Sequence, residues 1–260
     1  LPVTGEAGAT ADMDEIFGHQ SFAWQGEGQT VASARGFLPA FKSTSAGRAA
    51  MPGRADRVSE SSAASPFRDF PSRGAVVVFD LEITAWEGSL ARNWSGPGEF
   101  MEIVQIGAVK LDASMPMAEL ASFEVLVKPE KNPVLSDYFI DLTGITNEDL
   151  GRDGMPLDEA VSRFAGFIGD AGLVVSNGND WCDLVLNVEW AGMKWPFPNG
   201  LFANMRPRLA EALGLPESQT VSSTLPQHLG HTAMPDAHTG LGDARAIAFA
   251  VRELRARGHL

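Results

Sequence analysis

The stretch A-V-V-V-F-D-L-E-I-T at residues 75–84 constrains the fold of this chain more than any other. Its first five residues are apolar and three of them are valine, which predicts a central β-strand covered on both faces. Side chains alternate between the faces of a strand, so Asp80 and Glu82 point to the same side. Two carboxylates at the end of a buried strand need a proton, hydrogen bonds or a cation. The stretch therefore predicts either a divalent-metal site or a strand that leaves the core at Asp80 with both acids solvated.

The charge of the chain lies mainly in its folded part. The 260 residues carry a formal net charge of −13, and residues 1–72 hold only 8 acids and 6 bases. An acidic domain argues against a broad, salt-dependent grip on long duplex nucleic acid, which needs clustered Lys and Arg. It leaves open the binding of short single strands at a metal site.

Residues 1–72 differ in composition from the rest of the chain. They are rich in Ala, Gly, Ser and Pro and show no sustained period, which predicts a flexible low-complexity leader before a domain at 73–260. Two interpretations of the leader stay open: a tail without a specific role, and a segment that docks a protein partner through its few apolar residues.

Cysteine content and hydropathy bear on the compartment. The single cysteine, Cys182, excludes a disulfide framework within the chain and favours a reducing cytoplasm. No apolar run approaches the roughly 18 residues of a membrane span, and no signal peptide is visible. We therefore expect a cytoplasmic protein without a membrane partner.

Hydrophobic periodicity predicts an α/β fold. Met101–Leu111 and Leu120–Lys128 read as strands that follow the first one without a helix between them, which indicates a β-meander. Leu173–Ser176 reads as a later strand reached through helices. The resulting expectation is a mixed β-sheet flanked by helices on both faces. Helices or helical turns are expected at 135–142, from 147, and at 156–168, 180–190, 205–213, 222–229 and 240–257.

A second group of acids follows the later strand, in V-V-S-N-G-N-D-W-C-D at 174–183. Asp180 stands where a helix begins, and a helix N-cap is its simplest interpretation. Asp183 follows almost one turn later and can project from the same side of that helix. Either acid can reach a site on the sheet.

A third group is A-H-T-G-L-G-D-A-R at 237–245. Taken alone, His238 reads as a surface residue before a helix and Asp243 as a partner of the helix dipole. Together with the other two groups they complete a set of an acid pair, a lone acid, and a histidine with an acid.

This set resembles the motifs of the DEDD superfamily of 3′-5′ exonucleases in its histidine-bearing form, DEDDh, which includes ribonuclease T and oligoribonuclease. Asp80 and Glu82 match the first motif, D-x-E, and His238 and Asp243 match the third, H-x4-D. Asp180 in S-N-G-N-D matches the middle motif best. Asp183 remains the alternative, because the chain departs from the middle motif W-G-x-x-D. N-P-V-L-S-D-Y-F at 132–139 and L-T-G-I-T at 142–146 resemble the branch that contains the histone-mRNA and small-RNA 3′ exonucleases.

The resemblance implies a ribonuclease H-like fold over about residues 73–258 and a function. The function is hydrolysis of single-stranded RNA or DNA from the 3′ end, with release of nucleoside 5′-monophosphates. Two Mg²⁺ or Mn²⁺ ions, which prefer carboxylate oxygens, would activate a water and stabilise the leaving oxygen. By resemblance the metal ligands are Asp80, Glu82, Asp180 and Asp243. His238 would be the general base, for which its ordinary pKa of about 6.5 is suited.

Residues that hold the terminal nucleotide are expected next to the first motif. By resemblance Ile83 and Thr84 fall at these positions. Trp86 or Phe139 could stack on a base, but core packing is the alternative for both aromatics. Two other functions stay open: an oligonucleotidase acting on very short RNA, favoured by the acidic domain, and a non-catalytic nucleic-acid or protein binding module on the same fold.

Overall fold

The computed structural model describes residues 67, 69–234 and 236–260, so most of the expected leader lies outside the described residues. The described chain contains a five-stranded mixed sheet in the order β3-β2-β1-β4-β5. The central strand β1 (Ala75–Ile83) pairs antiparallel with β2 (Ile103–Asp112), which pairs antiparallel with β3 (Glu119–Leu126). On its other side β1 pairs parallel with β4 (Leu173–Ser176), followed by β5 (Phe202–Asn204). The predicted meander and the central position of β1 are confirmed.

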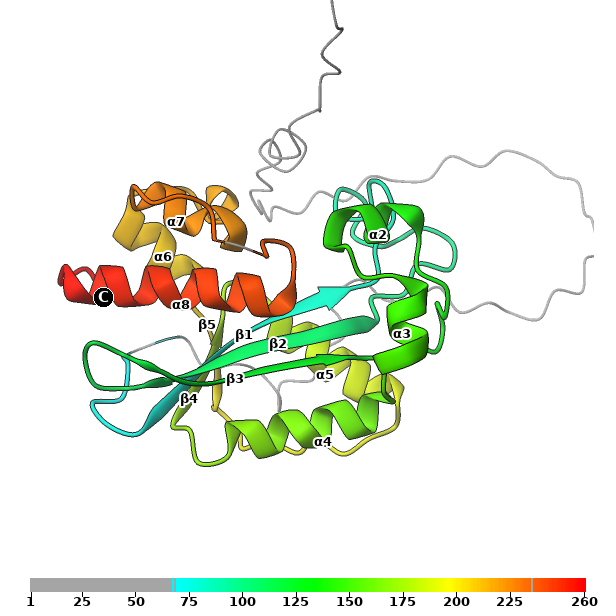
Figure 1. Ribbon diagram of the computed structural model, residues 1–260, viewed down its shortest axis with the longest axis horizontal. Coiled ribbons are helices and arrows are strands. Elements are labelled where there is room, and N and C mark those ends of the chain that lie inside the picture. Colours follow the sequence, from blue (N-terminus) through cyan, green and yellow to red (C-terminus); the bar gives the residue numbers. More distant parts are fainter. Residues whose placement is uncertain (1–66, 68, 235) are drawn as a thin grey trace, which may run out of the picture. The chain divides into compact units, whose positions relative to one another are not determined.

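Helices cover both faces of the sheet, as predicted (Figure 1). The long helix α8 crosses one face with α6 and α7 beside it, and α4 and α5 lie on the other. Two short helices follow β3 at one end of the sheet. The helices are α2 (Asp137–Thr143), α3 (Asn147–Asp153), α4 (Leu157–Ile168), α5 (Asp180–Trp190), α6 (Arg206–Leu213), α7 (Leu225–His228) and α8 (Gly240–Ala256), with the 3₁₀ turns η3 (Glu217–Gln219) and η4 (Ser222–Thr224).

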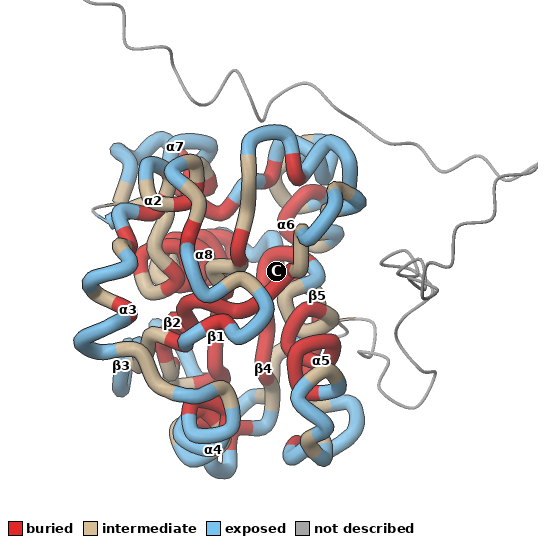
Figure 2. Tube along the Cα trace, turned by 90° about the vertical axis from the view of Figure 1, so that its right-hand side faces the viewer, coloured by how far each residue is buried: buried red, intermediate tan, exposed pale blue. Residues whose placement is uncertain are grey.

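The core has one large apolar cluster on each face of the sheet. The strands β1, β2, β4 and β5 between the clusters are mostly buried, whereas the edge strand β3 contains no buried residue (Figure 2). Alternation along β1 divides its side chains between the two clusters. Val76 and Val78 pack under α8, whereas Val77 and Phe79 pack against α4 and α5. The two acids of β1 continue the row that faces α8, so the period of two carries them to the same side as that helix.

A third, smaller cluster lies under α2 and α3. Ser136 caps α2 by accepting a hydrogen bond from the backbone N–H of Phe139 at 3.0 Å. Thr146 and Asp149 form a capping box at the start of α3. The cluster consists of Val104, Leu135, Phe139, Ile145 and Leu150.

Two elements differ from the sequence prediction. The strand β5 was not expected, because three residues carry too little periodicity to be recognised. The helix expected at 222–229 is instead the 3₁₀ turn η4 followed by the single turn α7. Pro226 has no N–H to donate, so an α-helix cannot run through this segment without losing a hydrogen bond.

The packed part of the chain includes residues just before Arg73. Phe67 and Phe70 lie against the cluster under α8, and the guanidinium of Arg255 lies 4.8 Å from the centre of the Phe70 ring. The end of the expected leader therefore contacts the domain. Over the part of the chain that the structure describes, no helix is both long and apolar enough to cross a membrane.

Candidate active site

Three acids that are distant in the sequence meet at the end of β1. One carboxylate oxygen from each of Asp80, Glu82 and Asp243 lies within 4.8 Å of the others. Asp80 and Asp243 are each 9% exposed, and Glu82 is half-buried. The group thus joins the first strand to the last helix at a site that is largely shielded from water.

The start of α8 is held against the sheet by backbone contacts. The N–H of Gly240 donates to the side-chain oxygen of Gln105 on β2 at 2.7 Å. Thr239 is the N-cap, and its hydroxyl accepts from the N–H of Gly242 at 3.1 Å. Asp243 lies in the first turn of α8, so these contacts fix its distance from β1.

His238 is presented by a tight turn at the start of α8. Asp236 and His238 have φ of 61° and 63°, in the left-handed region, and the Thr239 hydroxyl donates to the carbonyl of Asp236 at 2.8 Å. The backbone of His238 lies close enough to the Asp243 carboxylate to lower its pKa. The half-buried His238 therefore lies next to the acid group at the start of α8.

Asp180 approaches the same group from α5. The simple N-cap interpretation is wrong, because Asn179 is the N-cap and Asp180 is the first residue of the helix. The charge of Asp180 raises the pKa of Asp80, Glu82 and Asp243, so Asp180 lies near them, although it is not among the acids that lie within 4.8 Å of one another. Asp183 is 5% exposed and lies within α5, where its backbone carbonyl accepts from the Asn187 amide at 2.8 Å.

Burial and mutual repulsion make these acids hold protons tightly. Burial raises the pKa of Asp80 well above its usual range, and the charges of Asp180, Asp243 and Glu82 raise it further, against a hydrogen bond from Ser222 that lowers it. Burial, Asp243 and Asp180 raise the pKa of Glu82 in the same way. Burial also raises the pKa of Asp243 to about 6, although the charge of His238 lowers it. Protonation or a bound cation relieves this repulsion.

The donor set fits a hard divalent cation. Three carboxylates have oxygens within 4.8 Å of one another, and the charge of a fourth, Asp180, acts on them from nearby. One oxygen of Asp243 is buried without a hydrogen-bond partner among the described residues, which leaves a lone pair free for a metal. Carboxylate oxygens are the ligands that Mg²⁺ and Mn²⁺ prefer.

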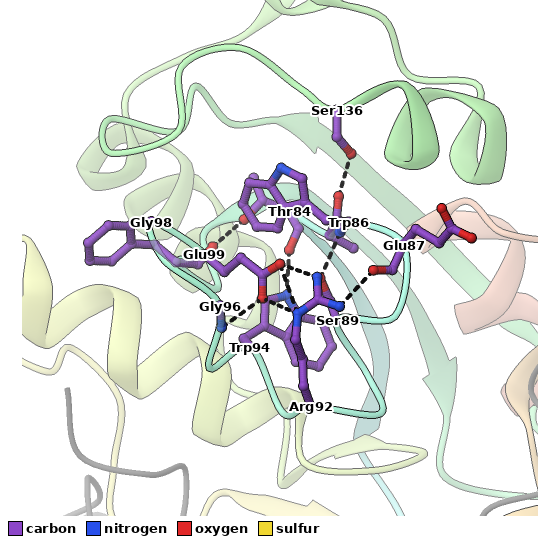
Figure 3. A network of polar contacts seen from close by, with 12 residues as sticks. Thr84, Trp86, Glu87, Ser89, Arg92, Trp94, Gly96, Gly98, Glu99 and Ser136 are labelled. Carbon is purple, nitrogen blue, oxygen red and sulfur yellow. Dashed lines mark hydrogen bonds and ion pairs between the residues drawn. The ribbon is translucent and has the colours of Figure 1, made fainter. Parts of the chain in front are cut away.

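Thr84, which the resemblance placed at the nucleotide, is occupied by structural bonds (Figure 3). Its hydroxyl donates to the carbonyl of Phe100 and accepts from the N–H of Glu102 at 3.0 Å. Its backbone N–H donates to Glu102 and its carbonyl accepts from the Trp94 indole, both at 2.8 Å. Thr84 is 2% exposed, so in this structure it anchors the loop at 85–100.

The remaining candidates for nucleotide contacts differ in accessibility. Phe139 is 1% exposed inside the third cluster, so core packing describes it and no ring face is free to stack on a base. Ile83 packs partly against the cluster under α4 and α5. Trp86 is half-buried in the loop, where its backbone N–H donates to the Ser89 hydroxyl at 2.8 Å (Figure 3).

Other residues of the site had no signal in the sequence. The Ser222 hydroxyl donates to Oδ1 of Asp80 at 3.4 Å, although the two residues are 142 positions apart. Gln105 and Gly107 on β2 contact the start of α8, and the sequence around them contains no recognisable motif. A polar residue inside an apolar strand, as Gln105 is, was the one available indication.

Known proteins resemble this chain over most of the described residues. The exonuclease family profile (RNase T) matches residues 77–249. The 3′-5′ exoribonuclease 1 of Rattus norvegicus is 27% identical in an alignment of 208 residues that covers 75% of this chain and 56% of the rat protein. Its counterpart from Homo sapiens is 28% identical over 212 residues, 75% of this chain and 55% of the human protein. The chain therefore spans about half the length of the curated relatives it matches.

Solved structures share its fold. The nuclease domain of 3′hExo, a DEDDh family member bound to rAMP, superimposes with a TM-score of 0.61 at 24% identity and covers 72% of this chain and 94% of that one. E. coli exonuclease I in complex with a dT13 oligonucleotide gives a TM-score of 0.53 at 12% identity, over 71% of this chain and 42% of that one. At these identities the likeness shows the fold alone, which is the ribonuclease H-like fold expected from the sequence. From the match over residues 77–249, the chain belongs to the exonuclease family, whose members are nucleases that hydrolyse phosphodiester bonds.

Proposed function

We propose that this protein is a metal-dependent 3′-5′ exonuclease that shortens single-stranded nucleic acid. The observation that carries the proposal is the convergence of Asp80, Glu82 and Asp243 within 4.8 Å, with Asp180 beside them. Such a group is costly to keep without cations, and family membership supplies a reaction that uses them.

In this proposal Asp80, Glu82, Asp180 and Asp243 hold two divalent ions, Mg²⁺ or Mn²⁺. When bound, the ions supply Lewis acidity toward the scissile phosphate and its leaving oxygen. Burial of the acids keeps water from competing for them and keeps their charges strong.

His238 is the general base of the proposed reaction. It removes a proton from the attacking water, whose oxygen bonds to phosphorus while the bond from phosphorus to the 3′-oxygen of the next nucleotide breaks. The departing 3′-oxygen takes up a proton. The products are a nucleoside 5′-monophosphate and a strand one nucleotide shorter with a 3′-hydroxyl. His238 directly precedes the N-cap of α8 and Asp243 lies in the first turn of that helix, which keeps base and acid group together.

We also propose the nucleotide contacts. Ile83 and the half-buried Trp86 are the candidates for the terminal nucleotide, and Thr84 and Phe139 support them from behind through the loop and the third cluster. Stacking on an indole contributes about 1–3 kcal/mol per base where it occurs.

RNA is the favoured substrate. The relatives from rat and human are named exoribonucleases, and one structural neighbour is described as recognising the 3′ end of a histone mRNA stem-loop. The acidic composition favours, as a second candidate, very short RNA, because few cations are available to hold a long backbone. A protein partner for residues 1–72 and a cytoplasmic location remain predictions.

A time course on 5′-labelled RNA and DNA of matched sequence and several lengths tests the function. With Mg²⁺ or Mn²⁺ the wild-type protein should release nucleotides one at a time from a 3′-hydroxyl end, and His238→Ala should be about 10²- to 10⁴-fold slower. Faster cleavage of dimers than of long RNA would favour the oligonucleotidase. Metal binding without turnover on any substrate would favour a binding module instead.

A further inference from the structure

A chain of buried polar groups leads from a backbone carbonyl to the carboxylate of Asp80. The Asn177 amide nitrogen donates to the carbonyl of Thr220 at 2.7 Å and to the Ser222 hydroxyl at 3.1 Å. The Ser222 hydroxyl donates to Oδ1 of Asp80 at 3.4 Å. Asn177 is 2% exposed and Ser222 is 8% exposed, so water does not compete effectively for these groups.

The direction of each hydrogen bond is fixed by the first acceptor. The carbonyl of Thr220 can only accept, so the group of Asn177 that faces it is the amide NH₂. The second hydrogen of this NH₂ then points at Ser222, whose oxygen becomes the acceptor. The hydroxyl proton of Ser222 is left to donate, and its recorded acceptor is Asp80.

In this orientation the side-chain oxygen of Asn177 is buried and makes no hydrogen bond with the described residues. An unsatisfied buried oxygen costs free energy, so the two hydrogen bonds that the amide nitrogen donates must hold the side chain in this orientation. A flip of the Asn177 amide would place its side-chain oxygen against the carbonyl oxygen of Thr220.

The same asparagine belongs to the turn that carries Asp180. The Asn177 carbonyl accepts from the Arg206 guanidinium at 2.6 Å, and the Asn204 amide donates to the side chain of Asn179 at 3.3 Å. The turn between β4 and α5 is thus fixed by its neighbours β5 and α6. A shift of Asn177 moves both the hydroxyl at Asp80 and the approach to Asp180.

We propose that Ser222 is a positioning residue for the carboxylate of Asp80 and that Asn177 directs its hydroxyl proton. The proposal rests on the proposed function, in which Asp80 is a metal ligand. Ser222 restrains the rotation of that carboxylate so that its remaining lone pairs serve cations. The bond of 3.4 Å is longer than the usual 2.5–3.0 Å for O–H···O, and bonds of this kind in active sites commonly tighten when the ligands are bound.

Calorimetric titration of the full chain with Mn²⁺ tests this role. Loss of a residue that orients a metal ligand typically weakens metal binding about 10- to 100-fold, which is the effect expected for Ser222→Ala. Ser222→Thr keeps the hydroxyl and should recover most of the affinity. Ser223→Ala is the matched control, since Ser223 is 7% exposed beside Ser222 and outside this chain of bonds.

The double variant of Asn177→Ala and Ser222→Ala tests whether the two residues act through the same hydroxyl or affect the structure independently. Asn177→Ala should weaken Mn²⁺ binding too, but adding it to Ser222→Ala should cost little more, because both act through one hydroxyl. Raising the Mn²⁺ concentration should restore nucleotide release in Ser222→Ala and not in Asp80→Asn. A melt in chelator checks that each variant is folded.

Three results would overturn the proposal or a part of it, and each can be told from the others. If the wild-type protein binds Mn²⁺ and Ser222→Ala binds it equally well, the positioning role alone is wrong. If the wild-type protein binds no Mn²⁺ and releases no nucleotide, the proposed function fails and the role of Ser222 fails with it. Additive losses in the double variant would point to independent structural effects.

Discussion

Gly107 of β2 lies directly against Gly240, the first residue of α8. A Cβ atom on Gly107 would come within 2.0 Å of the carbonyl carbon of Gly240, and Gly107 pairs in register with Asp80 of β1. The helix that carries Asp243 therefore rests on the sheet at the level of the first metal-ligand candidate. The absence of side chains at Gly107 and Gly240 allows this close approach of α8 to the sheet.

Gly107→Ala should displace the start of α8 and weaken the site. Overpacking of this kind costs about 1–3 kcal/mol of stability, and we expect at least tenfold weaker Mn²⁺ binding as Asp243 moves away from β1. Calorimetry and a thermal melt measure the two effects. Gly151→Ala on α3 is the control, because a Cβ atom there meets nothing within 4 Å. Unchanged Mn²⁺ binding in Gly107→Ala would show that the close approach does not set the site.

The variants Asp180→Asn and Asp183→Asn should differ in metal binding. The charge of Asp180 acts on Asp80, Glu82 and Asp243, so Asp180→Asn should weaken metal binding and lower nucleotide release about 100-fold or more. Asp183→Asn should keep metal binding and alter mainly the melting temperature, since Asp183 is buried within α5. Calorimetry with Mn²⁺ on the two variants decides between them, and the opposite pattern would make Asp183 the ligand.

Metal should stabilise the fold through the acid group. A ligand at 100 times its Kd adds about 2.7 kcal/mol, which for a domain of this size raises Tm by about 5–10 °C. Asp80→Asn removes one repelled carboxylate, so in chelator at pH 8 its Tm should exceed that of the wild type. The same variant should lose the Mg²⁺-dependent rise in Tm and the release of nucleotides. Differential scanning calorimetry with and without Mg²⁺ measures this, and a wild-type Tm indifferent to Mg²⁺ would contradict it.

Stability of the metal-free protein should fall as pH rises from 5 to 8. Asp243 has a pKa of about 6 when folded against an ordinary value of 3.8, so the folded state binds its proton more tightly than the unfolded state. The stability that this proton contributes is fully present below about pH 4 and is lost as the pH rises through about 6. The loss amounts to about 2–3 kcal/mol. Asp80 and Glu82 act in the same direction.

Melts in chelator across this pH range should therefore show a declining Tm that Mg²⁺ flattens or reverses. Asp243→Asn should have a shallower decline, because its amide neither ionises nor repels the other acids. A metal-free Tm that rises steadily from pH 5 to 8 would contradict the repulsion inferred for this group.

Local sequence determined the strand and the orientation of its acids. Alternation along A-V-V-V-F-D-L-E fixes Asp80 and Glu82 on one face whatever the rest of the chain does. The six residues from His238 to Asp243 span the start of one helix. These features depend on backbone periods of a few residues. The meander, the helices on both faces and the three separate acid groups followed from the same kind of pattern.

Tertiary structure decided which residues meet. The hydrogen bond from Ser222 to Asp80 joins residues 142 positions apart, and the bond from Gly240 to Gln105 joins residues 135 positions apart. Phe139 is a core residue because α2 packs against Val104. No local period carries such information, since each contact depends on how separate elements pack. The same packing placed Asp180 beside the other acids: β4 lies parallel to β1, so both strands end at one edge of the sheet and the helix after β4 begins there.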